Sequence, residues 1–274
     1  HCGGGHRNLT NAISLSCNSY FANAYRKTID TKSPTEESFN NWSDQMKSFG
    51  LGEYLNNDLS VGKKGVIPDF EFYNNWYPDF KWGATTTLSN SIGQGEVLVT
   101  PIQLANMTAA IANKGFYYTP HIIKKIEGAE IDSIFKIKNY TLIDSTYFDP
   151  IIEGLNKVYT SGTAKFLQVP GIEICGKTGT AENFTKINGK KTQLTDHSIF
   201  IAFAPKDNPT IAISVLVENG YYGSRWAGRI ASLMIEKHIK GEVTLKKMEQ
   251  LVINTNLAEE YEKPYLDKPF KINQ

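Results

Sequence analysis

The run Gly171-Ile172-Glu173-Ile174-Cys175-Gly176-Lys177-Thr178-Gly179-Thr180 decides how the rest of this chain is interpreted. Its first eight letters fit the phosphate-binding pattern GxxxxGK[ST], which in nucleotide hydrolases joins a parallel strand to a helix. Downstream, residues 198–204 and 210–217 are apolar stretches separated only by Pro205-Lys206-Asp207-Asn208-Pro209. This connection is too short for a helical crossover, so we predict that the two stretches are antiparallel neighbours. A P-loop nucleotide hydrolase requires a helix that begins at about Thr178. The interpretation that we favour, an antiparallel sheet with Lys177-Thr178-Gly179 on one of its strands, requires a strand through Lys177.

The composition of the 274 residues is that of a globular chain with balanced charge. Twenty-nine basic and 28 acidic side chains give a formal net charge of +1, and 41% of the residues are hydrophobic. This balance predicts no nucleic-acid partner and no general attraction to anionic membranes. No apolar run approaches the ~18 residues that span a bilayer. The three cysteines, Cys2, Cys17 and Cys175, form no CxxC pair and argue against a disulfide scaffold.

Local signals predict helices in the first two thirds of the chain and strands in the last third. Capping boxes at Ser33-Pro34-Thr35-Glu36 and Thr100-Pro101-Ile102-Gln103 each predict a helix start. Two further helices flank a break at Ser16-Cys17-Asn18. The remaining expectations are mostly loop over residues 51–95, short strands over 116–145, and helices over 146–160 and 227–239.

The Lys177-Thr178-Gly179 tripeptide suits the recognition of an anionic group. A strand that carries it presents a cation and hydroxyls beside exposed backbone amides, and glycine lets a ligand approach closely. Such an arrangement can bind a carboxylate and stabilise an oxyanion. Ser16-Cys17-Asn18 supplies an SxN tripeptide 159 residues before Lys177. SxN and KTG belong together in the signature of penicillin-binding proteins and β-lactamases, although SxN alone is equally a helix cap.

Several blocks in one order make the resemblance specific. They are Ser91-Ile92-Gly93-Gln94-Gly95, the stretch 99–105, Gly162-Thr163-Ala164, the stretch 176–182 and the stretch 197–205. In this order they resemble the transpeptidase domain of class B penicillin-binding proteins, and within that family the elongation-specific D,D-transpeptidases. The resemblance covers residues 8–239 and implies an α/β (α+β) fold. It has a predominantly antiparallel, probably five-stranded sheet packed between helices, as in serine β-lactamases and D,D-peptidases. We therefore divide the chain into residues 1–240, the C-terminal part of such a domain, and a tail over residues 241–274.

The family order SxxK, SxN, KTG places the nucleophile before Ser16. The two SxxK matches, Ser60-Val61-Gly62-Lys63 and Ser133-Ile134-Phe135-Lys136, both follow the SxN, so we reject them as nucleophile. The nucleophilic serine and its lysine are expected upstream of His1, in a longer protein, and the chain by itself is expected to be inactive.

The resemblance also implies roles for the residues that are present. Ser16 relays a proton, Asn18 orients the missing lysine and contacts a substrate amide, and Lys177 supports the positive field. Thr178 and Thr180, on either side of Gly179, offer hydroxyls to a terminal carboxylate. The Thr180 backbone N–H is one oxyanion donor.

The same resemblance implies substrate, partners and location. The substrate is a peptidoglycan stem peptide ending in D-Ala-D-Ala, and β-lactams are ligands of the same site. The partner is a lipid-linked glycan polymerase of the elongation machinery. The parent is expected at the periplasmic face of the bacterial inner membrane, held only by an N-terminal anchor that this chain lacks. The alternatives are a β-lactamase or β-lactam sensor of the same fold, and a non-catalytic relative used as a scaffold.

No cofactor is required, but a zinc hypothesis follows from the resemblance. Some relatives carry zinc beside the active site, with the middle residue of SxN as a thiolate ligand. Cys17 occupies that slot, and His6 lies upstream in a Gly-rich stretch. Four ligands are normally needed. The alternative is that Cys17 is a small buried filler and His6 a loop residue.

Overall fold

A computed structural model describes residues 7–29, 35–59 and 61–258. In chain order, the helices and strands are α1 (Leu9–Ser14), α2 (Asn18–Thr28), α3 (Glu36–Lys47), α4 (Phe70–Trp76), η1 (Leu88–Ile92), α5 (Pro101–Ala112), β1 (Phe116–Tyr118), η2 (Ser133–Lys136), β2 (Lys138–Tyr140), η3 (Ser145–Tyr147), α6 (Phe148–Thr160), η4 (Lys165–Leu167), β3 (Cys175–Ile187), β4 (Lys190–Ala204), β5 (Ile211–Val217), α7 (Ala227–Lys240) and α8 (Lys246–Asn254).

The main sheet has the strand order β3-β4-β5, and both pairings are antiparallel. Lys177 lies within β3, opposite Ile201 of β4, so a strand and not a helix runs through Thr178. This confirms the predicted antiparallel neighbours and excludes the P-loop alternative. Within the described residues this sheet has three strands, fewer than the five that the family fold led us to expect. Strands β1 and β2 form a separate two-stranded ladder.

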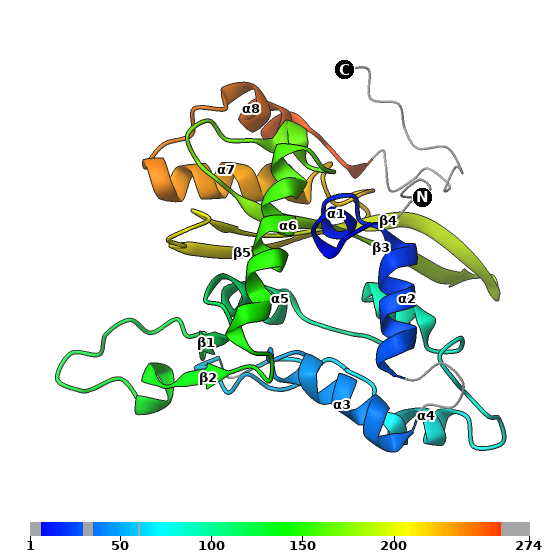
Figure 1. The fold of residues 1–274 in the computed structure, drawn as a ribbon. Helices are drawn as coiled ribbons and strands as arrows, with labels where there is room; N and C mark the ends of the chain where they lie inside the picture. Colours follow the sequence, from blue (N-terminus) through cyan, green and yellow to red (C-terminus); the bar gives the residue numbers. More distant parts are fainter. Residues whose placement is uncertain (1–6, 30–34, 60, 259–274) are drawn as a thin grey trace.

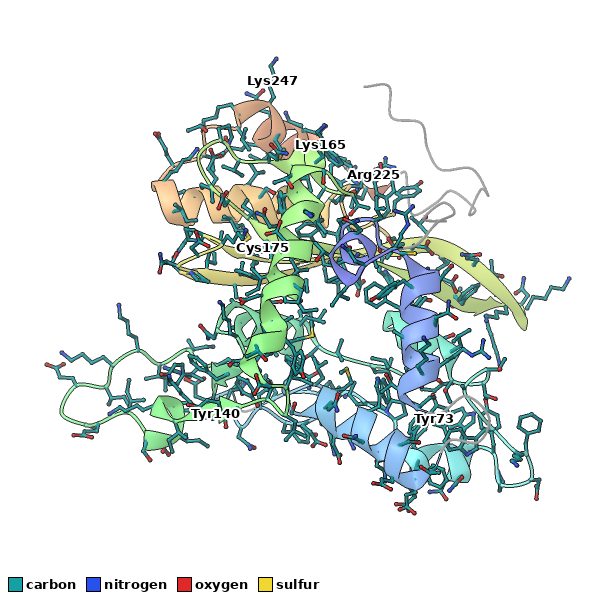
Figure 2. The ribbon with its side chains drawn as sticks, in the orientation of Figure 1. Tyr73, Tyr140, Lys165, Cys175, Arg225 and Lys247 are labelled. Atoms are coloured by element: carbon teal, nitrogen blue, oxygen red, sulfur yellow. The ribbon has the colours of Figure 1, made fainter. Side chains whose placement is uncertain are left out.

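Helices enclose the sheet on both faces (Figure 1). Helix α7 covers one face and α5 the other, while α6 runs beside β3. The core forms where these layers meet. Phe200 of β4 is fully buried, and its ring meets that of Tyr159 of α6 edge to face at 5.8 Å. Cys175 lies near the centre of the molecule beside α6 (Figure 2), and its thiol contacts the Ile152 carbonyl at 3.6 Å. Burial raises the pKa of this thiol to about 12, which fits a core residue.

Helix caps agree with the sequence at one site and shift at another. The Thr100 side chain accepts from the Gln103 N–H, and the Gln103 side chain accepts from the Thr100 N–H, which is the predicted capping box. For α3 the N-cap is Thr35, paired with Ser38, two residues later than predicted. Ser33 and Pro34 lie outside the described residues. The segment 51–95 is mostly loop as expected, with α4 and η1 as its only helical parts among the described residues.

Part of the segment expected to be a tail is folded. Helix α8 packs against α7, and the fully buried Glu236 side chain of α7 accepts from the N–H groups of Thr244 and Leu245 at 3.0 and 3.2 Å. Burial alone would raise the pKa of Glu236, but these hydrogen bonds and Lys240 at 3.2 Å outweigh it and lower the pKa. No helix in the described ranges is long and apolar enough to cross a membrane.

Candidate active site

A sharp turn at Ser16 separates α1 from α2 and presents the SxN residues. Ser16 has φ 52°, a left-handed conformation that ends α1, and the Cys17 N–H then donates to the Ala12 carbonyl at 2.9 Å. Asn18 is the first residue of α2 and is exposed, whereas Cys17 is 3% exposed. The alternation therefore places Ser16 and Asn18 at the surface and Cys17 in the interior.

The N-terminal turn meets strand β3 through Lys177. The Lys177 ammonium donates to Ser16 Oγ at 2.7 Å, to the Thr178 carbonyl at 2.9 Å and to Thr178 Oγ1 at 3.3 Å. Ser16 and Lys177 are 161 positions apart in sequence. The fold thus brings the SxN and KTG residues into direct contact.

The acceptors of Lys177 are uncharged oxygens, and burial sets the pKa of its ammonium. Burial lowers the pKa of the Lys177 ammonium from 10.5 to about 8, because the surroundings replace water poorly for the charged form. At neutral pH the group is still mostly protonated. It is therefore a cation that gives up its proton more easily than an ordinary lysine.

A third segment joins the site through Gly162 and Thr163. The Thr163 hydroxyl lies 3.2 Å from that of Thr178. A Cβ at Gly162 would stand 2.3 Å from the carbonyl oxygen of Ser14, so only glycine lets this loop approach the end of α1. The Gly162-Thr163 dipeptide therefore locks α1 and β3 together beside the site.

These segments enclose one cleft of about 380 Å³. Its lining consists of Ser16, Asn18, Phe21, Ser91, Ile92, Gln94, Lys177, Thr178, Gly179 and Thr180. All six residues predicted for catalysis and substrate binding are in this list. Three residues of the Ser91-Ile92-Gly93-Gln94-Gly95 block also line the cleft. That block was quoted only for its resemblance, and no site role was assigned to it.

A buried polar network fixes the wall formed by residues 88–95. Asn90 Nδ2 donates to the Tyr73 hydroxyl at 2.9 Å, and this hydroxyl donates to Glu96 at 2.7 Å. The hydroxyl of Tyr25, on α2, donates to Thr87 Oγ1 at 3.0 Å. Burial and the neighbouring carboxylate of Glu96 raise the pKa of Tyr73, so it stays protonated as a donor. The network ties α2, which carries Asn18, to the opposite wall.

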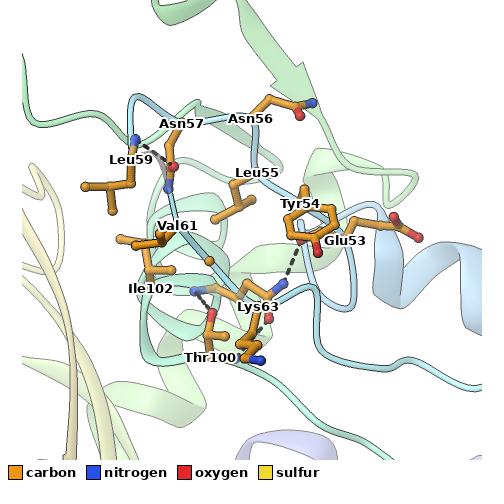
Figure 3. Close-up of a pocket in the computed structure, with 12 residues that line it drawn as sticks. Glu53, Tyr54, Leu55, Asn56, Asn57, Leu59, Val61, Lys63, Thr100 and Ile102 are labelled. Atoms are coloured by element: carbon orange, nitrogen blue, oxygen red, sulfur yellow. Dashed lines mark hydrogen bonds between the residues drawn. The ribbon is translucent and has the colours of Figure 1, made fainter.

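One of the two rejected SxxK matches lies outside the cleft. Ser133 to Lys136 form the 3-10 helix η2, and neither residue lines the cleft. Ser60 lies outside the described residues. Lys63 lines a separate pocket of about 400 Å³ between the loop around Tyr54 and the start of α5 (Figure 3).

The described residues do not supply a set of ligands for the hypothesised zinc ion. No group of three or more His, Cys, Asp or Glu side chains that could hold a metal ion occurs among residues 7–29, 35–59 and 61–258. Cys17 is in a disulfide bond, so a thiolate ligand at this position would require the reduced form. His6 lies outside the described residues. The zinc site therefore stays a prediction.

Comparisons with known proteins agree with this geometry. Residues 1–236 match the family described as "Penicillin binding protein transpeptidase domain". The peptidoglycan D,D-transpeptidase MrdA of Acinetobacter baumannii is 34% identical over 228 residues, which are 79% of this chain and 32% of that protein. The chain spans about a third of the length of the curated relatives it matches.

Solved structures give the same picture. The Pseudomonas aeruginosa PBP2 structure, in complex with WCK 5153, superposes with a TM-score of 0.70 at 28% identity, covering 96% of this chain and 52% of that one. A peptidoglycan synthase complex, described as coordinating polymerization and crosslinking, gives a TM-score of 0.65 at 28% identity, with 89% and 42% covered. These matches confirm both the family resemblance and the predicted fold class.

Proposed function

Because this chain belongs to the family of penicillin-binding-protein transpeptidase domains, we propose that it forms one half of the active site of a serine-type peptidoglycan D,D-transpeptidase. The observation that carries the proposal is the 2.7 Å contact between Lys177 Nζ and Ser16 Oγ inside the cleft. This contact brings the SxN and KTG motifs together, and a serine D,D-transpeptidase uses both motifs in one active site.

The proposed roles follow from the positions of the side chains. Lys177 supplies the cation that attracts the terminal carboxylate of a stem peptide ending in D-Ala-D-Ala, and it polarises the Ser16 hydroxyl. Ser16 passes a proton toward the departing amine. Thr178 and Thr180 offer hydroxyls to the carboxylate across Gly179. Asn18, exposed at the start of α2, is free to contact the substrate amide and the missing lysine.

The nucleophile is proposed to come from outside these 274 residues. Both SxxK matches in the chain follow the SxN, and Ser133 and Lys136 do not line the cleft, so the attacking serine and its lysine are assigned to an upstream segment of the parent protein. That serine forms the acyl-enzyme, and an amine of a second stem peptide then resolves it into a crosslink. The chain alone is expected to bind but not to turn over.

Location and partners are proposed from the relatives. A stem-peptide substrate places the enzyme at the periplasmic face of the inner membrane, held by an anchor outside this chain. The match to a synthase complex that coordinates polymerization and crosslinking supports a glycan polymerase as partner. β-Lactams, which mimic D-Ala-D-Ala, are expected to acylate the same serine. We assign residues 1–240 to this domain.

Labelling of the intact protein with a fluorescent penicillin tests the proposal. The wild-type protein should retain a covalent label, and variants with Ala at the upstream serine should not. Rapid release of the label as hydrolysed penicillin would instead identify a β-lactamase. Absence of any label on a folded protein with an intact SxxK would overturn the transpeptidase assignment.

A further inference from the structure

Gln94 occupies the edge of β3 at the point where a substrate backbone would pair. Its Nε2 donates to the Thr180 carbonyl at 3.1 Å, across 86 positions of sequence. Strand β3 is an edge strand of the described sheet, because only β4 pairs with it. The N–H and C=O of one strand residue point to the same edge. Since the Thr180 carbonyl faces Gln94 in the cleft, the Thr180 N–H faces the cleft as well.

Backbone geometry and hydrogen bonds of residues 88–95 fix the position of Gln94. Gly93 and Gly95 on either side have φ values of 72° and 73°, which only glycine adopts without strain. The Gln94 N–H donates to the Ser89 carbonyl at 3.0 Å, which closes the end of η1. Asn90, one turn earlier, is 6% exposed and anchored to Tyr73.

We propose that Gln94 guards the substrate edge of β3 by occupying the Thr180 carbonyl until a ligand N–H displaces it. The proposal rests on the transpeptidase function above. In an antiparallel pair, the residue whose carbonyl accepts from Thr180 also donates its own N–H to the Thr180 carbonyl. If the Thr180 N–H donates to the scissile carbonyl, the group that donates back to the Thr180 carbonyl is the N–H of the penultimate D-Ala. This N–H and Gln94 Nε2 therefore compete for one acceptor.

The competition makes Gln94 a determinant of ligand selectivity. A ligand with an amide N–H beside the reacting carbonyl, such as an acylamino penicillin, must displace the guard. A penam with only hydrogen in that place, such as sulbactam, has neither an N–H nor an O–H there and leaves the bond intact. Removing the guard should strengthen noncovalent binding of the penicillin by about 2- to 10-fold, which corresponds to one ordinary hydrogen bond.

The test compares Gln94→Met with wild type in the intact protein that carries its nucleophile. Methionine keeps the length of the side chain and removes the donor, and Gln94→Ala serves as a second variant. Gln45→Met is the matched control, because the Gln45 side-chain amide, on α3, donates to Asn41 Oδ1 at 3.2 Å and does not line the cleft. Stopped-flow acylation separates the dissociation constant of the first complex from the acylation rate constant.

The expected result is a dissociation constant for benzylpenicillin lowered about 2- to 10-fold in both Gln94 variants, with the acylation rate constant, sulbactam binding and the Gln45 control unchanged. An unchanged or higher dissociation constant for benzylpenicillin in both variants overturns the proposed role of Gln94. An equal gain for both ligands also overturns it, because it indicates general loosening of the wall. If the wild-type protein takes no label at all, the proposed function itself fails.

Discussion

Replacing Lys177 with methionine should stabilise the protein while abolishing acylation. The pKa of about 8, against 10.5 for an ordinary lysine, means that the folded state disfavours the charged form by ~3 kcal/mol. Methionine removes that cost but also removes the donor to Ser16 Oγ and to the Thr178 carbonyl, which offsets ~1–2 kcal/mol. The net expectation at pH 7 is a gain of ~1–2 kcal/mol.

The pH dependence of this gain is its more specific feature. The folded-state pKa lies below the unfolded one, so the cost is complete below about pH 8 and disappears as the pH rises toward 10.5. Between pH 7 and pH 10 the cost of burying the Lys177 charge should fall from ~3 to ~1 kcal/mol. The stability advantage of Lys177→Met over wild type should therefore shrink by ~2 kcal/mol over that interval.

Denaturant unfolding of the intact protein at pH 7 and pH 10 measures this difference. Lys186→Met, an exposed lysine on the same strand, is the control and should stay within ~0.5 kcal/mol of wild type. Fluorescent penicillin should not label the Lys177 variant. A constant free-energy difference between Lys177→Met and wild type at the two pH values would refute the reasoning, because it would mean that the buried ammonium is not desolvated.

Three further variants test the site and its support. Ser16→Ala should slow penicillin acylation by about 10²- to 10⁴-fold and cost ~1 kcal/mol of stability, because Lys177 loses its 2.7 Å acceptor, as stopped-flow labelling and urea unfolding will show. Gly223→Ala would place a Cβ 2.4 Å from the Gly179 carbonyl oxygen and should cost at least ~2 kcal/mol in urea unfolding, whereas Gly62→Ala, where a Cβ meets nothing within 4 Å, should be tolerated. Glu236→Gln should cost ~2 kcal/mol, because the N–H groups of Thr244 and Leu245 lose the charged acceptor that Glu236 provides; limited proteolysis after α7 should then become faster.

Local signals were sufficient where a few neighbouring residues decide the structure. The Thr100 capping box and the short connection between β4 and β5 act over a handful of positions, and both were predicted correctly. The strand extension over residues 181–197 was missed, because its residues are largely exposed and show no apolar alternation. The Asn188-Gly189 pair, with φ values of 50° and 78°, carried the available signal for this hairpin.

The contacts within the site were harder to predict than the motifs that supply its residues. Ser16 and Lys177 were found through a resemblance, but their contact depends on how α1, α6 and β3 pack, which no short window contains. Gln94 was missed as a site residue for the same reason. Its partner is the backbone carbonyl of Thr180, and every residue has such a carbonyl, so the sequence gives no signal for this contact. Helix α8 was missed although Met248, Leu251, Val252 and Ile253 are apolar, because none of its residues is buried and its place depends on contacts of Glu236 with the preceding loop.

The free-energy cost of burying the Lys177 charge bears on why uncharged acceptors surround it in the cleft. A desolvated cation whose acceptors are hydroxyls and a carbonyl destabilises the free protein, and selection for stability alone would remove it. On the proposed function, a carboxylate that binds beside Lys177 supplies the opposite charge that the uncharged acceptors lack. The guard at Gln94 acts on the same principle for the backbone, because it keeps the Thr180 acceptor satisfied until a ligand N–H replaces it.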